Sequence, residues 1–211
     1  MRPVIVPAIL TDTFADIEDS VVLLSGLARE IQIDVVDGDY APRTTWPFHS
    51  DSAKAEWGKL ALLQKDLVFE LDLMVREPKQ YFPLLKEKGF NRLILHYGST
   101  DSLKETLESA RRMRFQVGLA ITNDNSLDDA SDYFELVDWI QVMGIKEVGE
   151  QGQEFDDAVV QAVSQGSLSN LLSIKEETID EAHENGEPCN GDRPMSADGL
   201  SDDVDGRVGS R

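Results

Sequence analysis

A chain of 211 residues with 41% hydrophobic residues can form one domain with a buried core, and it is too apolar for a wholly disordered protein. Its formal net charge of −20 argues against nucleic-acid binding and against anionic membranes, but backbone N–H groups could still bind a small anion. The single cysteine, Cys189, and the absence of a membrane-spanning or signal-like apolar run predict a cytoplasmic protein.

The first part of the chain alternates strand-like and helix-like patterns. Val4–Leu10 is an apolar run of strand length, and apolar residues over 14–27 then recur at the three- and four-residue spacing of a helix. Ile31–Val36 predicts a second strand, which a long loop through about Ser50 follows. Val68–Met74 predicts a third strand.

The same alternation continues to about residue 163. Pro78 marks the start of the next helix, and Leu103, Leu107 and Ala110 share one face of another. The expected elements are, in order, helix Tyr81–Lys88, strand Leu93–His96, a helix around Leu103–Ala110, strand Val117–Ile121, helix Leu127–Phe134, strand Val137–Met143 and a helix around Phe155–Val163.

Six strand–helix repeats favour an α/β protein with a parallel sheet, either a closed (β/α)₈ barrel or an open doubly wound sheet. The first strand lacks a glycine-rich dinucleotide turn, which disfavours the second option. We expect a barrel core over residues 1–165, a residual helical segment over 166–186 and an acidic, disordered tail over 187–211. No apolar run in residues 187–211 looks like a buried strand, so the predicted (β/α)₈ TIM-barrel fold is incomplete, with strands 7 and 8 degraded or missing.

Two strands carry carboxylates on one face. Because strand side chains alternate, Gln32 and Asp34 share a face in one strand, and Glu70 and Asp72 share a face in the other. Buried charges are costly unless they are paired or bind a metal, and barrel enzymes carry their active sites at the carboxyl ends of the strands. The alternative is that Asp34 and Asp72 are hydrated or bonded to loop amides at strand ends.

Other polar or flexible positions have simpler interpretations. Asp37-Gly38 is a favoured turn pair, and His96 at a strand end is more often structural than a ligand. Met74 and Met143 would ordinarily fill a core. The paired glycines of the loop 149–155 could turn backbone amides toward an anion, although such a loop alone is weak evidence.

Taken in order, four segments resemble the ribulose-phosphate 3-epimerase family. Val6-Pro7-Ala8-Ile9-Leu10 is similar to the family's opening strand, and Ile33–Pro42 is similar to its Ile-Asp-Val-Met-Asp-Gly run. Leu71–Val75, with the Pro and Tyr that follow, resembles His-Leu-Met-Val-x-x-Pro-x-x-Tyr. Val142-Met143 and the loop 149–155 resemble the Val-Met strand and the glycine-rich loop after it.

The resemblance implies a (β/α)₈ barrel that interconverts D-ribulose 5-phosphate and D-xylulose 5-phosphate by proton transfer at C3 through a metal-stabilised enediolate. Asp34 then corresponds to one catalytic, metal-binding aspartate. The residues that correspond to substrate-binding positions are Met74, Met143, Gly149, Gly152 and Gln153.

Several positions depart from the family pattern. Ala8 replaces the early serine and Val36 replaces one lining methionine, while Gln32 and Asp72 stand where the family has ligand histidines. The Asp-Gly-Gly of strand seven, with the second catalytic aspartate, is missing between Ile174 and Lys175, and the phosphate turn after strand eight has no counterpart.

Asp34 and Asp72 are nevertheless expected to hold a divalent metal. Among Mg, Mn, Fe and Zn, the oxygen-rich pair favours Mg²⁺ or Mn²⁺. Without a metal, two close carboxylates would raise the pKa of one of them and leave a proton donor.

Two functions therefore remain open at this point. One is an epimerase acting on a pentulose phosphate, and the other is a catalytically impaired family member that binds a sugar phosphate or a protein partner without turnover. A homo-oligomer is compatible with the open sheet edges of an incomplete barrel, but no surface stripe gives a subunit count.

Overall fold

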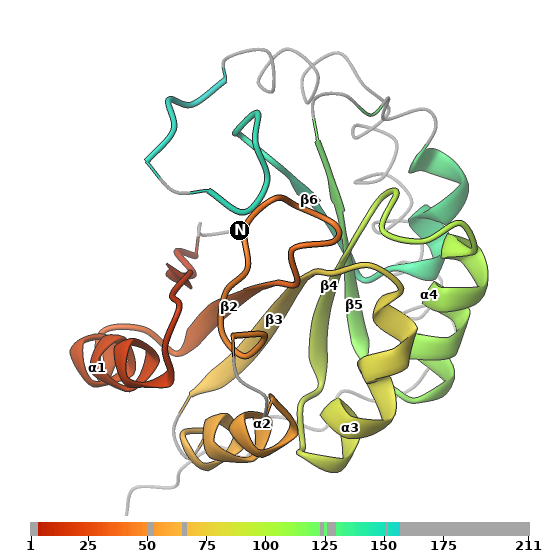
Figure 1. The fold of residues 1–211 in the computed structure, drawn as a ribbon. Helices are drawn as coiled ribbons and strands as arrows, with labels where there is room; N and C mark the ends of the chain where they lie inside the picture. The colour runs from red at the N-terminus through yellow and green to blue at the C-terminus, as the bar shows by residue number, and fades with distance from the viewer. Residues whose placement is uncertain are drawn as a thin grey trace, which may run out of the picture. The chain divides into compact units, whose positions relative to one another are not determined.

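The computed structural model describes residues 4–49, 53–64, 67–122, 125, 130–150 and 152–156. In these residues six parallel strands form one curled sheet, and their order in the sheet is their order in the chain (Figure 1). A doubly wound sheet would reverse its strand order, so the arrangement confirms the predicted (β/α)₈-barrel type. The strands are β1 (Ala8–Ile9), β2 (Glu30–Val36), β3 (Val68–Met74), β4 (Arg92–His96), β5 (Gln116–Ile121) and β6 (Trp139–Val142).

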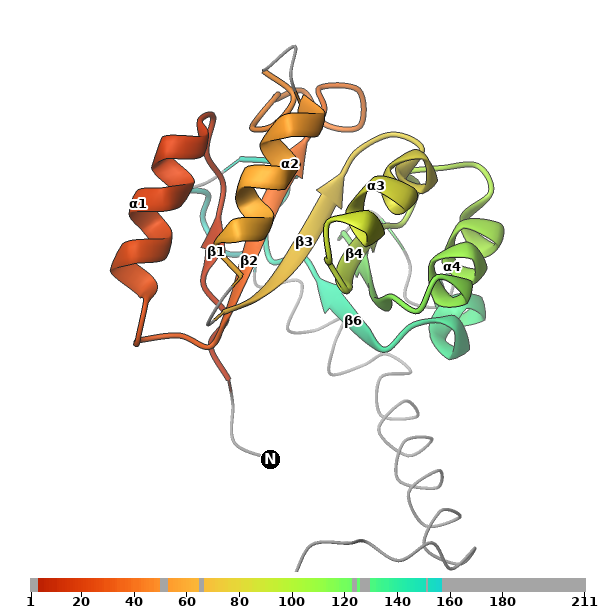
Figure 2. The ribbon, with the colours of Figure 1, turned by 90° about the horizontal axis from the view of Figure 1, so that it is seen from below.

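Helices follow one another around the outer face of this sheet (Figure 2). The helices are α1 (Phe14–Leu24), α2 (Ala53–Leu62), α3 (Phe82–Glu87) and α4 (Leu103–Arg112), with the 3-10 turns η1 (Pro78–Tyr81) and η2 (Ser131–Leu136). Each helix connects two neighbouring parallel strands, which is the crossover that parallel pairing requires.

The main hydrophobic core lies between the outer face of the sheet and the helices. Leu93 and Leu95 of β4 and Val117 and Leu119 of β5 alternate into this core, so the residues between them point to the inside of the curled sheet. The helices contribute, among others, Ile17, Val21, Trp57, Leu60, Phe82, Leu85, Leu107 and Ala110.

Local sequence explains where α1 and α4 begin and which faces they bury. Thr13 caps α1, because its hydroxyl oxygen accepts a hydrogen bond of 3.2 Å from the backbone N–H of Asp16. In α4 the predicted face of Leu103, Leu107 and Ala110 is buried. Both helices therefore form where the apolar periodicity predicts them.

The observed elements differ from the expected ones in three places. β1 is shorter than the predicted Val4–Leu10, since Val4 and Ile5 are exposed and pairing with β2 begins at the carbonyl of Pro7. α2 was not expected, because only Trp57 and Leu60 anchor it in the core. Of the short helix expected at 127–134, residues 127–129 lie outside the described part, Ala130 is helical, and η2 continues to Leu136, two residues beyond the expected end.

Several expectations fall on parts of the chain outside the described residues. These are most of the helix expected around Phe155–Val163, the helical segment 166–186 and the acidic tail 187–211. The proposed division into these segments, and the loss of strands 7 and 8 from the barrel, therefore rest on the sequence.

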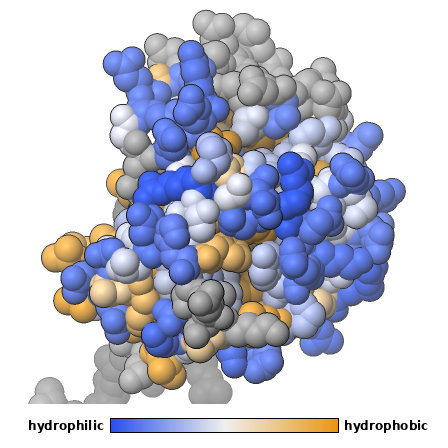
Figure 3. All heavy atoms as spheres, viewed as in Figure 1, coloured by the Kyte–Doolittle hydropathy of each residue, from blue (hydrophilic) through white to orange (hydrophobic). Residues whose placement is uncertain are grey.

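The surface is mostly hydrophilic in the view of Figure 3, and apolar side chains gather over α1. Val22 and Leu23 of this helix are 73% and 74% exposed. Among the described helices, none combines the length and the apolar character needed to cross a bilayer.

Candidate active site

Two carboxylates face the inside of the curled sheet from neighbouring strands. β2 and β3 pair in parallel with Asp34 opposite Asp72 in the register. Ile33 and Val35 point to the outer core, so Asp34 points inward between them, as the alternation of the sequence predicts. The structure therefore brings together the two residues that the sequence singled out.

Asp34 lies in a partly buried position, with Gln32 two residues before it on the same strand face. The Gln32 Nε2 donates a hydrogen bond of 2.7 Å to Asp34 Oδ1. Burial, the Asp72 carboxylate and, to a smaller extent, Glu70 together raise the pKa of Asp34 to about 7, and the hydrogen bond from Gln32 opposes the shift. Asp34 is thus a carboxyl group that exchanges its proton near neutral pH.

Asp72 is almost completely buried, with 1% of its surface exposed, and three side chains surround its carboxylate. The His96 Nε2 lies 2.6 Å from Asp72 Oδ1. On the other oxygen, Oδ2, the amide nitrogens of Gln141 and Gln32 donate hydrogen bonds of 3.0 and 3.3 Å. The interpretation of Asp72 as a hydrated strand-end residue is therefore wrong.

An ion-pair layer lies below the two aspartates, toward the amino ends of the strands. Arg92 forms contacts of 2.9 Å with Glu70 and 2.6 Å with Glu30, and its guanidinium stacks 5.0 Å from the ring centroid of Trp139. The indole occupies space that only Gly118 leaves open, since a Cβ at this position would clash with Trp139. Burial raises the pKa of Glu70, and the Arg92 charge opposes this shift.

At the carboxyl ends of the strands, a small apolar cluster lies beside the aspartates. Met74 and Val36 pack there with Leu10 and Ala41, and Tyr40 covers the cluster. Burial, followed by the Asp72 charge, raises the pKa of Tyr40 to about 12, so its hydroxyl stays protonated. Met74 is only 2% exposed and fills a core, in line with the simpler of its two interpretations.

The glycine-rich loop after β6 folds back toward this end of the barrel. Gly149 adopts a φ of 85°, a left-handed conformation that favours glycine, and it lies beside Val36 and Ala41. The Gln153 side chain closes the loop, because it accepts from the Glu147 backbone N–H and donates to the carbonyls of Glu147 and Glu150.

The remaining predicted positions are less closely tied to the aspartates. Met143 follows β6, and its sulfur accepts a 3.4 Å contact from the Gln141 amide. Gly152 has a φ of 77° and open space around its Cα. The structure thus places Asp34, Asp72, Met74 and Met143 around one end of the barrel, with Gly149 over it.

The turn at Asp37-Gly38 is structural, as its sequence predicts. One Asp37 carboxylate oxygen accepts from the backbone N–H groups of Asp39 and Tyr40, and the other accepts from the N–H of Arg76 at 2.7 Å. Both oxygens are therefore used to fix the β2 and β3 ends.

The sequence analysis missed two contributors to the site. His96 was expected to be structural, and Gln141 was not singled out at all. The signal for Gln141 was present, because it is a polar residue inside the apolar strand run Val137–Met143, on the same kind of inward position as Asp34.

The partners of Asp34 and Asp72 do not fit a resident divalent metal. The two oxygens that face each other across the strands, Asp34 Oδ1 and Asp72 Oδ2, accept hydrogen bonds from the side-chain amides of Gln32 and Gln141, which compete with a bridging cation. Within the described ranges, no group of three His, Cys, Asp or Glu side chains could hold a metal ion. The predicted metal role of the two aspartates stays a prediction, and no step below passes through a metal.

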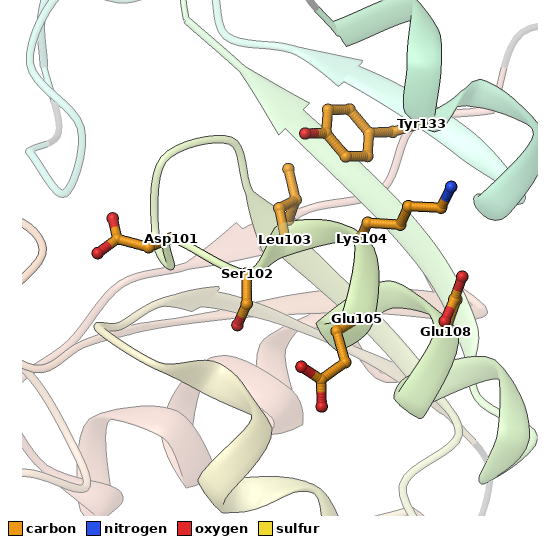
Figure 4. Close-up of a pocket in the computed structure, with 7 residues that line it drawn as sticks. All are labelled: Asp101, Ser102, Leu103, Lys104, Glu105, Glu108 and Tyr133. Atoms are coloured by element: carbon orange, nitrogen blue, oxygen red, sulfur yellow. The ribbon is translucent and has the colours of Figure 1, made fainter.

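A cavity of about 340 Å³ at the start of α4 offers no better site for an anionic sugar (Figure 4). Asp101, Glu105 and Glu108 line it together with Lys104, and Tyr133 covers Leu103. None of the predicted site residues lines this cavity, and its acidic lining would repel a phosphate.

Comparison with known proteins finds one consistent family. The sequence profile described as the Ribulose-phosphate 3 epimerase family matches residues 4–179. The ribulose-phosphate 3-epimerase of Chlamydia muridarum is 29% identical over 150 residues, which cover 70% of this chain and 59% of that protein. The Schizosaccharomyces pombe protein of the same name is 26% identical over 153 residues, covering 72% of this chain and 64% of that protein.

The alignment with a third relative covers more of that protein's length. The ribulose-phosphate 3-epimerase of Mycobacterium bovis is 26% identical over 198 residues, or 89% of this chain and 82% of that protein. The chain spans less than two thirds of the first two relatives, so part of the complete enzymes has no matching residues in those alignments.

Proposed function

The chain belongs to the ribulose-phosphate 3-epimerase family, and from this we propose that it binds a pentulose 5-phosphate at the carboxyl ends of its strands and exchanges the C3 proton through Asp34. The complete reaction of this proposal interconverts D-ribulose 5-phosphate and D-xylulose 5-phosphate. The observation that carries the proposal is the inward position of Asp34 beside a second carboxylate on the neighbouring strand.

Asp34 has the proton affinity that this chemistry needs. A general acid or base works best when its pKa lies near the working pH, and burial with the nearby Asp72 charge raises the pKa of Asp34 to about 7. The ionised carboxylate would take the proton from the carbon beside the ketone, and the resulting acid would return it. Gln32 holds Asp34 Oδ1 and leaves the second oxygen of Asp34 for this transfer.

Inversion at C3 requires a second acid or base on the opposite face of the enediolate. The inward positions of β5 and β6 are Gly118, Ala120, Trp139 and Gln141, and none of them carries a carboxylate. Asp72 lies next to Asp34 rather than across from it. We therefore propose that proton exchange with solvent at C3 is faster than inversion.

Substrate contacts are assigned by position around this end of the barrel. Met143 would lie along the carbon chain of the sugar, Met74 would support this part of the site from the apolar cluster, and the loop that carries Gly149, Gly152 and Gln153 would hold the phosphate through its backbone N–H groups. The Gln153 side chain closes this loop, so its part in the proposal is to shape the loop and not to contact the phosphate.

The second candidate function is binding of a sugar phosphate without turnover. The observation that favours it is the change of both ligand-histidine positions to Gln32 and Asp72, together with the saturation of Asp72 by hydrogen bonds. Binding needs only the loop and the apolar positions, whereas turnover needs a free acid or base.

A solvent-exchange experiment separates the two functions. The protein is incubated with D-ribulose 5-phosphate in deuterated water, and NMR follows deuterium at C3 while a coupled assay follows D-xylulose 5-phosphate. We expect deuterium incorporation that exceeds inversion, and its loss by about 10²- to 10⁴-fold in Asp34→Asn.

The matched control is Asp39→Asn, which makes the same change in charge at an exposed residue near the same strand end. Unchanged exchange is expected in this control. Sugar-phosphate binding by calorimetry without any exchange would favour the second function, and absence of both binding and exchange would contradict the two together.

A further inference from the structure

One amide group bridges the two aspartates of the barrel interior. The Gln32 Nε2 lies 2.7 Å from Asp34 Oδ1 and 3.3 Å from Asp72 Oδ2. A cation that bridges Asp34 Oδ1 and Asp72 Oδ2 would need oxygen lone pairs at which this amide is directed. The bridge therefore occupies the place where a shared metal ion would be bound.

Two further donors reach the Asp72 carboxylate. His96 reaches Oδ1 from β4, and Gln141 reaches Oδ2 from β6. With Gln32 from β2, three strands contribute one donor each to a carboxylate on the fourth. A buried carboxylate with this many donors is stabilised without a metal.

The half-buried cation Arg92 pairs with carboxylates other than the two aspartates. Arg92 is used by Glu70 and Glu30 one layer below and is stacked on Trp139. The Arg92 charge is therefore taken up by these two glutamates, and the aspartate layer depends on its own donors.

We propose that in this chain a hydrogen-bonded network of Gln32, Gln141 and His96 replaces the divalent metal at Asp34 and Asp72. The two positions that the family resemblance assigns to ligand histidines, 32 and 72, now hold a donor amide and the carboxylate that receives it. The proposal concerns metal binding, and only the role of Asp34 as the reacting group rests on the proposed function.

The test measures metal content and affinity, independently of turnover. The purified full chain is dialysed against Mn²⁺ or Zn²⁺, its bound metal is determined by mass spectrometry, and Zn²⁺ affinity is measured by calorimetry. We expect substoichiometric metal and no rise in melting temperature for the wild-type protein. Stoichiometric metal that is lost in Asp34→Asn would overturn the proposal.

A gain-of-binding variant makes the test specific. Gln32→His combined with Asp72→His removes the bridge and supplies two nitrogen ligands beside Asp34. Since outer partners alone change metal affinity by about 10- to 100-fold, we expect Zn²⁺ binding at least about 100-fold tighter than in the wild-type protein. Gln80→His adds a histidine at an exposed position and should gain nothing.

The single variant Gln32→His covers the case in which the double variant does not fold, as judged by circular dichroism. It should bind Zn²⁺ more tightly than the wild-type protein, because the bridging donor is gone. Folded variants with wild-type Zn²⁺ affinity would overturn the claim that the network controls the metal. Failure of the C3 exchange reaction would leave these affinities unchanged, so the two proposals fail independently.

Discussion

Asp34 and Asp72 lie opposite each other on neighbouring parallel strands, and the Gln32 amide contacts both carboxylates. Burial, followed by the neighbouring Asp72 charge, raises the pKa of Asp34, so its proton is held up to a higher pH than in an exposed aspartate. This relationship makes the stability of the protein depend on pH.

We predict that the free energy of unfolding falls as the pH rises from about 4 to about 7, because of Asp34. Its pKa is raised from 3.8 to about 7, so in this window the folded state binds a proton that the unfolded state has released. Asp34→Asn should remove this part of the slope and stabilise the protein above pH 7 by on the order of 1–2 kcal/mol. Urea unfolding of the wild-type and Asp34→Asn proteins across this pH range measures both the slope and the stabilisation.

Asp39→Asn serves as the control for that experiment, because its side chain is exposed. It should keep the wild-type slope. An Asp34→Asn protein with an unchanged slope between pH 4 and pH 7 would contradict the burial of a shared proton at this site.

His96→Leu is expected to destabilise the protein by about 2–4 kcal/mol. The change leaves Asp72 Oδ1 buried without its donor at 2.6 Å, and an unsatisfied buried charge is costly. His96→Gln keeps an N–H donor and should recover part of the loss. Thermal unfolding of the two variants checks which one is more stable. Equal losses of stability would mean that packing rather than hydrogen bonding decides the effect.

Arg92→Met is expected to cost about 2–4 kcal/mol at neutral pH, because Glu70 would lose its ion-pair partner in a mostly buried position. Loss of the Arg92 charge raises the pKa of Glu70 further, so the cost should shrink as the pH falls and Glu70 becomes neutral. Adding Glu70→Gln to Arg92→Met should restore stability. Denaturant unfolding of the single and double variants at two pH values measures this coupling.

Gly118→Ala is expected to destabilise the protein by about 1–3 kcal/mol, since the new Cβ would clash with the Trp139 indole. Gly58→Ala is the matched control, because Gly58 lies within α2 with open space around it. That change should stabilise the helix by about 0.5–1 kcal/mol. Tryptophan fluorescence and thermal unfolding together distinguish the two, and equal effects would place Trp139 elsewhere.

The fold could be predicted well from local patterns. The bounds of β3 agree with the predicted Val68–Met74, because the alternation of Phe69, Leu71 and Leu73 with polar residues is a local signal. α2 escaped prediction, since Trp57 and Leu60 are its only fully buried apolar residues among the described side chains, and alanines, charged residues and an exposed leucine make up most of the rest. Tertiary packing of two residues, rather than periodicity, stabilises this helix.

The site could be predicted only in part. Asp34 and Asp72 were found from the sequence because strand alternation places them on the inward face without knowledge of any partner. Their partners were not found. Gln141 lies 69 residues from Asp72 in the chain, and His96 lies 24 residues away, so no local pattern connects them.

The sequence by itself determined the order of strands and helices, the family and the two inward carboxylates, because each of these follows from the period of neighbouring residues or from short motifs. Only the tertiary structure decided how the carboxylates are satisfied. Strand register brings Gln32, His96 and Gln141 onto Asp72, and burial then favours hydrogen-bonded neighbours over water. The proton affinity of Asp34 follows from this enclosure, which no single strand can provide.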